Sequence, residues 1–368
     1  MANSSDNILA NGYSIFQGSD ALSDFSQFVD NAGKVYSSIH LLLDENVEQL
    51  CLPVLFDKAP SLNNCSLIRT PSGEINKNIN TVVDIWKRLM EGGANRNSLL
   101  INLGGGVITD MGGFAASTFK RGIDFVNIPT TLLGQVDASI GGKTGIDLLE
   151  IKNQVGLIKS PVAVFVIPEF LKTLDHQQLK SGYAEILKYG LISDKRLWEL
   201  AIDKYAALSN YQESTWNDLI NRSLVIKNEI VLNDPEEQGL RRVLNFGHTI
   251  GHAVEAHSLK NDKVPLSHGE AVAIGMICEA YISSKVLNLN SEERDEIAKT
   301  ILSIFEKYDL SKAQDTELLE LMKHDKKNQH GRKNFTLLKN IGEAVIDQQC
   351  DDVLIVEALD YYRNYGKS

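Results

Sequence analysis

Three short segments, far apart in the chain, carry the residue types of a metal-dependent active site. Glu185 lies in the motif SGYAEILK, His248 and His252 lie in NFGHTIGH, and His268 lies in SHGE. A carboxylate and imidazoles form a ligand set that suits Zn²⁺, and three protein ligands leave a coordination position open for substrate. The three motifs therefore predict a catalytic metal centre.

The spacing of His248 and His252 allows two interpretations. They are four residues apart, so on a helix they share one face. The same spacing occurs in H-E-x-x-H zinc proteases, but the residue after His248 is Thr249, and the general base of that motif is missing. This excludes that class of protease. A single histidine is most often an ordinary core or surface residue, yet four of the chain's eight histidines lie between positions 248 and 268, three of them in the motifs above, and this favours a site.

An apolar run ends in glycines at LGGGVITD, as at the start of a dinucleotide pyrophosphate site. Gly104 and Gly106 fit the beginning of G-x-G-x-x-G, but Thr109 stands at the third glycine, so an ordinary strand-to-helix turn stays open. Asp44, after an earlier strand, suits an adenosine ribose or a simple turn. A nicotinamide site and a zinc site in one chain together indicate redox chemistry on a hydroxylated substrate.

The segment GGKT resembles the end of a phosphate-binding P-loop. That loop requires a glycine five residues before the Gly-Lys pair, and Asp137 occupies that position, which excludes a Walker A motif. A lysine among flexible glycines still suits an anion or a hydroxyl-rich substrate, so Lys143 is a candidate binding residue, with a plain loop as the alternative.

The composition is that of an ordinary globular protein: 368 residues, 43% of them hydrophobic and 23% charged, with a net charge of −11. The acidic balance argues against nucleic acid and against an anionic membrane as partners. No apolar run reaches membrane-spanning length, and no signal peptide is evident at the start. The four cysteines are scattered without a C-x-x-C pair, which predicts reduced thiols and a cytoplasmic enzyme.

The chain is long enough for two domains, and its texture changes near residue 170. Strand-like runs at 35–44, 98–103, 125–129 and 163–167, with a helical pattern at 79–92, predict a Rossmann-like α/β dinucleotide-binding domain over residues 1–170. Residues 171–368 predict an all-α metal- and substrate-binding domain, with helices at 177–192, 214–234, 248–257, 269–286 and 291–308. A strand-like piece at 334–338 precedes the last helix.

With these residues in view, the chain strongly resembles the 3-dehydroquinate synthases, a family of sugar phosphate cyclases. The match runs from about Asp44 to the region of Leu337. It covers, in order, G-G-G-V-I-x-D, P-T-T-L-L-x-Q-V-D-A-S-I-G-G-K-T-G, L-x-S-G-x-A-E-x-x-K, L-N-F-G-H-T-x-G-H-A-x-E and H-G-E-A-V-A-x-G-M. Several long motifs in register are far more specific than any one of them. Thr109 replaces a glycine common in the first motif, but it flanks the turn without having to face the pyrophosphate.

The resemblance implies a role for each matched position. The zinc (or cobalt) ligands are Glu185, His248 and His268, and His252 is not a ligand. NAD is placed over the glycine turn, and its contacts are Asp44, Asn46, Glu74, Lys77, Gly104, Gly105, Gly106, Asp110, Thr130, Thr131 and Thr173. The substrate contacts are Arg121, Asp137, Lys143, Lys152, Asn153, Lys188, Lys227, Glu237, Arg241, Asn245, His252 and one lysine of the run 325–327, either Lys326 or Lys327.

The implied reaction converts 3-deoxy-D-arabino-heptulosonate 7-phosphate to 3-dehydroquinate and phosphate, in a protein that the family suggests is a homodimer. Oxidation at C5 by NAD, loss of phosphate, reduction by the same NADH, ring opening and aldol closure follow one another, so NAD is not consumed. Alternatives are a cyclase that makes 2-epi-5-epi-valiolone or 2-deoxy-scyllo-inosose, a glycerol-dehydrogenase-like metal alcohol dehydrogenase, or a non-catalytic binding protein. Arg241, Asn245, His252 and the Asp-Lys-Lys run favour dehydroquinate.

Overall fold

The computed structural model describes residues 7–149, 151–205, 211–323 and 333–366. The chain divides into two compact units, Met1–Asp175 with Tyr211–Glu236, and His176–Asn210 with Glu237–Ser368. The sequence predicted a single boundary after residue 170. The division differs because helix α8 (Glu213–Asn233) returns to the first unit, where it contacts the turns η4 (Gly134–Ala138) and η5 (Pro168–Thr173).

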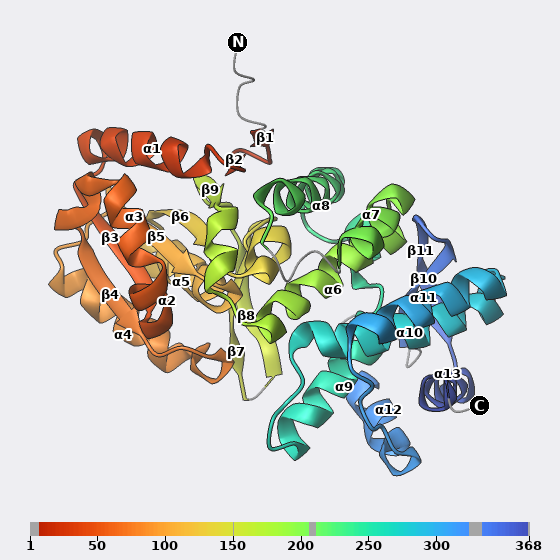
Figure 1. The fold of residues 1–368 in the computed structure, drawn as a ribbon. Coiled ribbons are helices and arrows are strands. Elements are labelled where there is room, and N and C mark those ends of the chain that lie inside the picture. Colours follow the sequence, from red (N-terminus) through yellow and green to blue (C-terminus); the bar gives the residue numbers. More distant parts are fainter. Residues whose placement is uncertain (1–6, 150, 206–210, 324–332, 367–368) are drawn as a thin grey trace. The chain divides into compact units, whose positions relative to one another are not determined.

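The first unit is built on a seven-stranded sheet (Figure 1). Across the sheet the strands are β1 (Ile8–Leu9), β2 (Ser14–Gln17), β9 (Ala163–Val166), β6 (Asp124–Pro129), β5 (Ser98–Gly104), β3 (Ser38–Asp44) and β4 (Ser66–Thr70). The β1–β2 pair is antiparallel and all other neighbouring pairs are parallel. The four predicted strands are confirmed as β3, β5, β6 and β9, although residues 35–37 precede β3 and Val35 ends helix α1 (Ala21–Val35).

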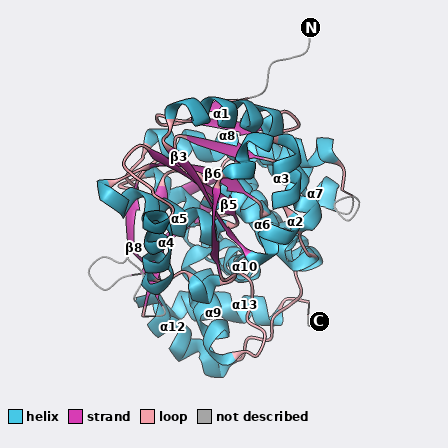
Figure 2. Cartoon of the chain, turned by 90° about the vertical axis from the view of Figure 1, so that its left-hand side faces the viewer, coloured by secondary structure: helices cyan, strands magenta, loops and turns pink. Residues whose placement is uncertain are grey.

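Both faces of this sheet are covered by helices, which explains the continuous apolar character of its central strands. Leu41, Leu99 and Ile101 pack with α1 and α3 (Leu52–Lys58), whereas Leu42 and Leu100 pack with α4 (Ile79–Glu91) and α5 (Gly106–Thr118). Figure 2 shows β3, β5 and β6 between α4 and α5 on one side and α2 (Glu45–Leu50) and α3 on the other. Successive residues therefore enter opposite cores.

The carboxyl ends of the parallel strands collect the turns that the sequence singled out. β5 ends at Gly104 and α5 begins at Gly106, while β6 ends at Pro129 and leads to the π-helical turn η4. In open parallel sheets, ligands bind at this edge. The antiparallel hairpin β7 (Lys143–Leu148) and β8 (Ile151–Ile158) follows η4 and contacts α5.

The second unit is mostly helical. Its helices are α6 (His176–Ile192), α7 (Lys195–Tyr205), α9 (His248–Asn261), α10 (His268–Val286), α11 (Ser291–Ile304), α12 (Asp315–Lys323) and α13 (Asp352–Asn364). The prediction of an all-helical domain is corrected by the hairpin β10 (Lys333–Asn340) and β11 (Glu343–Cys350). The prediction included a strand only at 334–338, because the exposed residues of β11 lack an apolar pattern. Helix α10 contacts α6, α9, α11, α13 and β10, and is therefore central to the unit.

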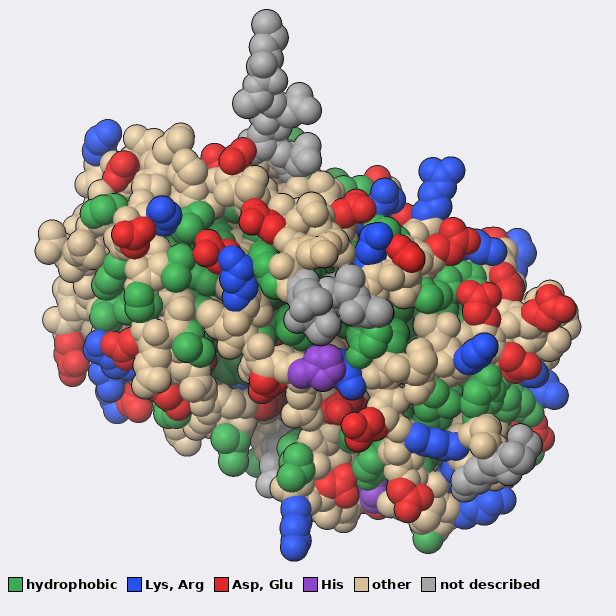
Figure 3. All heavy atoms as spheres, in the orientation of Figure 1, with side chains coloured by type: hydrophobic (Ala, Val, Ile, Leu, Met, Phe, Trp, Pro, Cys, Tyr) green, Lys and Arg blue, Asp and Glu red, His purple; other side chains and the backbone are tan. Residues whose placement is uncertain are grey.

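The surface carries charges of both signs. On the face shown in Figure 3, acidic and basic side chains are interspersed. Among the described residues, no helix combines the length and the apolar character needed to cross a membrane.

Candidate active site

The predicted metal ligands lie on three helices of the second unit. Glu185 is in the middle of α6, whereas His248 and His268 are the first residues of α9 and α10. Ser267 caps α10 through a reciprocal capping box with Glu270, which defines where that helix begins. Gly247 precedes α9 with φ = 79°, a left-handed conformation that favours glycine. The local sequence therefore sets both histidines at helix starts.

Glycines beside the ligands let these helices approach backbone to backbone. A Cβ at Gly269, next to His268, would lie 2.2 Å from the carbonyl oxygen of Ser181 on α6. A Cβ at Gly275 on α10 would lie 1.8 Å from the carbonyl oxygen of Gly247. Both distances are impossible for a real side chain, so the motifs need glycine for packing. This packing brings the three ligand-bearing segments together.

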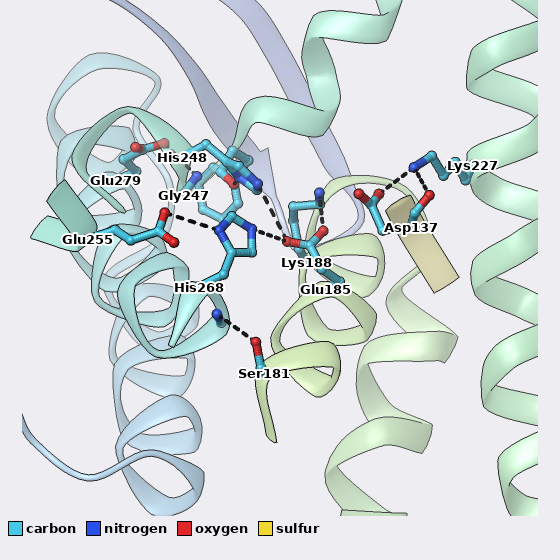
Figure 4. A network of polar contacts seen from close by, with 12 residues as sticks. Asp137, Ser181, Glu185, Lys188, Lys227, Gly247, His248, Glu255, His268 and Glu279 are labelled. Atoms are coloured by element: carbon cyan, nitrogen blue, oxygen red, sulfur yellow. Dashed lines mark hydrogen bonds and ion pairs between the residues drawn. The ribbon is translucent and has the colours of Figure 1, made fainter. Parts of the chain in front are cut away.

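The ligand atoms of Glu185, His248 and His268 lie within 4.8 Å of one another (Figure 4). Glu185 Oε1 is 3.5 Å from His248 Nε2 and 3.7 Å from His268 Nε2. A tetrahedral zinc ion with ligands at about 2.0–2.2 Å needs neighbouring ligand atoms roughly 3.3–3.6 Å apart. The donor set and its spacing therefore fit such an ion, and that these residues hold a metal stays a prediction.

The other ring nitrogen of each histidine has its own partner. His248 Nδ1 lies 3.0 Å from the carbonyl oxygen of Phe246, and His268 Nδ1 lies 3.3 Å from Glu255 Oε2. Such partners fix the tautomer and leave Nε2 available as a ligand. Burial opposes protonation of His268, but the carboxylates of Glu255 and Glu185 outweigh it and raise the pKa of His268 to about 10. The two carboxylates therefore favour positive charge at this imidazole, either as a proton or as a bound metal ion.

Lys188 and His252 border the cluster. Lys188 is 1% exposed and forms an ion pair with Glu185 Oε2 from one turn further along α6. His252 is exposed, and its ring centroid lies 5.2 Å from that of His248 and 5.9 Å from that of His268. His252, Glu255 and His268 form a second group whose ligand atoms lie within 4.8 Å of one another. Geometry alone therefore leaves the exclusion of His252 as a prediction.

Three further predicted residues lie in the segment that leads into α9. Arg241 and Asn245 belong to the 3₁₀ helix η6 (Leu240–Asn245), and the side chain of Arg241 is buried at 2% exposure. Glu237 has a left-handed φ of 59°. Charged side chains are rarely buried unless they are paired, so the burial of Arg241 indicates a held side chain in the segment just before His248.

The first unit contains a separate network around Lys77. Lys77 Nζ donates to Asp110 Oδ2 and to Asn153 Oδ1, both at 2.7 Å. Lys152 Nζ lies 3.7 Å from Glu74 Oε1. Burial would lower the pKa of Lys77, but Asp110 and Glu74 outweigh it, so the pKa is raised and the ammonium stays charged. The structure thus brings together five residues that the sequence analysis assigned to NAD or substrate.

Lys227 joins α8 to the turn η4 within the same unit. Its Nζ lies 2.7 Å from Asp137 Oδ1 and also donates to the carbonyl oxygen of Asp137 (Figure 4). Lys143 begins β7 and is exposed, after Gly141 and Gly142 with φ values of 94° and 70°. Only glycine adopts such angles easily, which explains the glycine pair before this lysine.

The glycine turn and its neighbours lie at the carboxyl edge of the sheet. Gly104 O accepts the N–H of Thr130 at 3.0 Å, and a Cβ at Gly105 would lie 2.9 Å from Thr131. This close packing links the ends of β5 and β6. The remaining predicted NAD contacts have local roles: Asp44 caps α2 by accepting the N–H groups of Asn46 and Val47, and Thr173 Oγ1 donates to Phe170 O.

Among the predicted residues that the structure describes, Arg121 stands apart. Arg121 is exposed, with φ = 72°, beyond the far end of α5 and just before β6 begins. It therefore lies at the amino edge of the sheet, away from the glycine turn. Lys326 and Lys327 lie outside the described residues. No role was predicted for the buried carboxylates Glu255 and Glu279. Glu255 ends the motif L-N-F-G-H-T-x-G-H-A-x-E, whereas Glu279 is marked only as an acidic residue inside the largely apolar α10.

Comparisons with known proteins agree with this architecture. Residues 67–181 match the family model for the 3-dehydroquinate synthase N-terminal region, and residues 182–328 match the C-terminal one. A 3-dehydroquinate synthase from Parabacteroides distasonis is 43% identical over 333 residues, covering 89% of this chain and 92% of the relative.

Two solved structures share the fold. A 2-epi-5-epi-valiolone synthase from Streptomyces hygroscopicus, solved with NAD⁺ and Zn²⁺, is 25% identical with a TM-score of 0.83, covering 97% of this chain and 98% of that one. A 2-deoxy-scyllo-inosose synthase with carbaglucose-6-phosphate, NAD⁺ and Co²⁺ is 23% identical with a TM-score of 0.86, covering 98% and 100%. The fold is thus that of the sugar phosphate cyclases. Within that class, the chain belongs to the 3-dehydroquinate synthase family.

Proposed function

We propose that this chain converts 3-deoxy-D-arabino-heptulosonate 7-phosphate to 3-dehydroquinate and phosphate, the step of the shikimate pathway that leads towards the aromatic amino acids. The observation that carries the proposal is the cluster of Glu185, His248 and His268, built from three family motifs at ligand spacing. The reaction needs a hydroxyl-activating centre, and this cluster is suited to provide one.

Glu185, His248 and His268 would hold Zn²⁺ or Co²⁺. When bound, such an ion acts as a Lewis acid and template that lowers the pKa of the substrate hydroxyl at C5. Lys188 contacts Glu185 Oε2, opposite the oxygen nearest the histidines, so it balances the carboxylate charge while leaving Oε1 to the metal. Glu255 and Phe246 O hold the Nδ1 protons, which keeps each Nε2 lone pair directed at the centre.

Residues of the first unit would hold NAD. When bound, NAD would supply reversible hydride-transfer chemistry at C5 without being consumed. Gly104–Gly106 bring backbone N–H groups of the α5 N-terminus to a pyrophosphate, whose charge the helix dipole favours. The proposed contacts Asp110 and Lys77 are held by their mutual ion pair, and Thr130 and Thr131 border the turn.

Two sets of side chains are proposed for the substrate's anionic groups. In the first unit Lys152 and Asn153 bind phosphate. In the second unit Arg241, Asn245 and His252 do so, with Arg241 able to donate two parallel hydrogen bonds. Lys143, Lys188, Lys227 and one lysine of 325–327 are the proposed carboxylate partners, and Asp137 and Glu237 are further proposed substrate contacts. Arg121, at the amino edge of the sheet, is not carried over into this set. The leaving phosphate can itself take the C6 proton, so these residues mainly position it.

The second candidate function is the reaction of another sugar phosphate cyclase, because the fold is shared with cyclases that act on other substrates. Those two solved structures are of a valiolone synthase and an inosose synthase, whereas the relative at 43% identity is a 3-dehydroquinate synthase, which supports the carboxylate-bearing substrate. We also propose a homodimer working in the cytoplasm. Exposed apolar side chains on the β7–β8 hairpin, including Leu149 at 85% and Ile158 at 55%, support association, and the free cysteines support a reducing compartment.

The test is to supply the heptulosonate phosphate in large excess over NAD and to follow phosphate, dehydroquinate and NADH absorbance together. The cyclase predicts many equivalents of phosphate and dehydroquinate per NAD without lasting NADH. Accumulation of one NADH per substrate consumed would instead indicate an alcohol dehydrogenase. Turnover of a substrate without the carboxylate, in preference to the heptulosonate phosphate, would indicate another cyclase.

A further inference from the structure

The β7–β8 hairpin is irregular where it carries Lys152 and Asn153. The register pairs on either side of the irregularity join Ile146 to Val155 and Leu148 to Ile151. Between these pairs β7 has the single residue Asp147, whereas β8 has the residues 152–154. This is a β-bulge with more than the usual single extra residue, and bulges bend a strand and redirect its side chains, often beside active sites. The bulge therefore determines how Lys152 and Asn153 are presented.

The carboxylate of Asp147 caps this bulge. Asn153 has φ = 53°, a left-handed conformation that asparagine tolerates better than most residues. In this conformation its backbone N–H donates to Asp147 Oδ1 at 2.8 Å. A side chain of β7 thus provides the acceptor for a backbone group that the bulge displaces from regular pairing.

Asp147 also belongs to a closed ring of hydrogen bonds. Its own N–H donates to the carbonyl oxygen of Lys77 at 2.8 Å. Lys77 Nζ donates to Asn153 Oδ1 at 2.7 Å, and Asn153 N–H returns to Asp147. Two residues of the β7–β8 hairpin and Lys77, which precedes α4, therefore hold one another, and Lys152 stands next to this ring in the sequence.

We propose that Asp147 is a positioning residue, whose side-chain oxygen maintains the bulge and so holds Lys152 and Asn153 ready for the substrate's phosphate. The inference rests on the proposed function in one respect, the assignment of Lys152 and Asn153 to that phosphate. In this proposal Asp147 acts through the backbone of Asn153, whose N–H its carboxylate accepts.

Charge and geometry make opposite predictions at this position. A carboxylate near Lys152 weakens the positive field that a phosphate requires, so neutralising it tightens anion binding by about 2- to 5-fold if charge dominates. Loss of the Asp147 oxygen leaves the Asn153 N–H without this acceptor and releases the bulge. If geometry dominates, the loss of this one hydrogen bond corresponds to about 3- to 10-fold weaker binding of the phosphate group. Asp147→Asn removes the charge but retains an oxygen for Asn153, whereas Asp147→Ala removes both.

The experiment measures the affinity of a non-reacting phosphonate analogue for the NAD-loaded enzyme by calorimetry, together with KM, kcat and the melting temperature. We expect Asp147→Asn to bind the analogue as well as the unchanged enzyme or up to about 5-fold more tightly. We expect Asp147→Ala to bind it about 3- to 10-fold more weakly, with KM raised more than kcat is lowered. Asp84→Ala, on the exposed face of α4, removes the same charge and should change neither quantity.

Lys152→Ala separates this inference from the proposed function. Suppose that Lys152→Ala lowers the affinity for the analogue, whereas Asp147→Ala binds the analogue as tightly as the unchanged enzyme or more tightly. The positioning role of Asp147 is then wrong, and the assignment of Lys152 to the phosphate survives. If Lys152→Ala leaves the analogue affinity unchanged, the phosphate assignment is wrong and the inference falls with it. The positioning role would also be wrong if both Asp147 variants had a lower melting temperature and lost affinity for the analogue equally. Asparagine keeps an acceptor for the Asn153 N–H, so Asp147→Asn should retain the affinity that Asp147→Ala loses.

Discussion

Replacing Glu279 by glutamine should loosen the metal centre without touching any ligand. Glu279 lies on α10, fully buried, and reaches the first turn of α9. Its Oε2 accepts the N–H of Gly247 at 2.7 Å, and its Oε1 accepts the N–H of Ile250 at 3.1 Å. His248 lies between these two anchored positions. One side chain of α10 thus fixes the start of α9, while α10 itself begins with the other histidine, His268.

The magnitude follows from those two bonds. Glutamine has one carbonyl oxygen, so either the Gly247 or the Ile250 N–H would lose its acceptor, at a cost of about 1–3 kcal/mol for a buried group. Loss of the negative charge at the helix N-terminus adds roughly 0.5–2 kcal/mol. Because the affected turn carries His248, we expect the metal affinity to fall about 10- to 100-fold, the usual effect of removing an outer partner of a ligand.

The assay is competition for Zn²⁺ against a chromogenic chelator, alongside urea unfolding of the metal-free protein. Ser283→Ala is the matched control, since Ser283 is equally buried one turn further along α10 but accepts the N–H of Leu338 in β10. Both variants should lose stability, and only Glu279→Gln should lose zinc affinity. Equal zinc affinity in the two variants would refute the reasoning and reduce Glu279 to a packing residue.

Three further outcomes are expected. His268→Ala should lose its metal whereas His252→Ala should keep it, measured as zinc per chain; equal loss would mean that the wrong histidine is excluded. Arg241→Ala should weaken a phosphonate analogue about 10- to 100-fold, since charge-assisted hydrogen bonds contribute roughly 1.5–3 kcal/mol, while zinc content and NAD affinity hold. Burial lowers the pKa of His40 on β3, so the unfolded chain takes up the proton first as pH falls below about 6.5, and stability declines from there down to the folded-state pKa. His40→Gln should flatten that decline in urea midpoints between pH 7.5 and 5, and an unchanged slope would remove His40 as its source.

The architecture was largely predictable because buried parallel strands and amphipathic helices leave strong patterns. Strands β3, β5, β6 and β9 are apolar runs, and the predicted ranges for α4, α6 and α10 differ from the observed ones by one residue at an end. The hairpin partner β11 (Glu343–Cys350) was missed because only Cys350 in it is buried. Helix α8 was read as a helix but assigned to the wrong unit, since its pattern shows an apolar face and not which unit contacts that face.

The residues of the candidate site likewise fall into those that the sequence predicts and those that only the structure reveals. Glycines and ligands stand in recognisable motifs, and the structure gives those glycines a reason, as with Gly275 against Gly247. The contacts of the groups that hold the ligands leave no such mark. Glu255 ends a quoted motif but nothing in it names a partner, Glu279 is a single acid in the largely apolar α10, and Asp147 is one polar residue in a strand. Their roles depend on which distant backbone N–H or ring nitrogen lies opposite, and that is determined only by packing.

The pair His248 and His252 shows why spacing could not decide the ligand set. The i, i+4 rule places both rings on one face of α9, which would favour them as joint ligands. His248, however, is the first residue of the helix, and its ring nitrogen is fixed by the carbonyl of Phe246 just outside it. Its Nε2 therefore faces Glu185 on α6, while His252 lies one turn inside the helix and is exposed. The helix start, set by Gly247 and anchored by Glu279, gives different surroundings to two histidines that the spacing presents as equivalent, and the exclusion of His252 as a ligand stays a prediction.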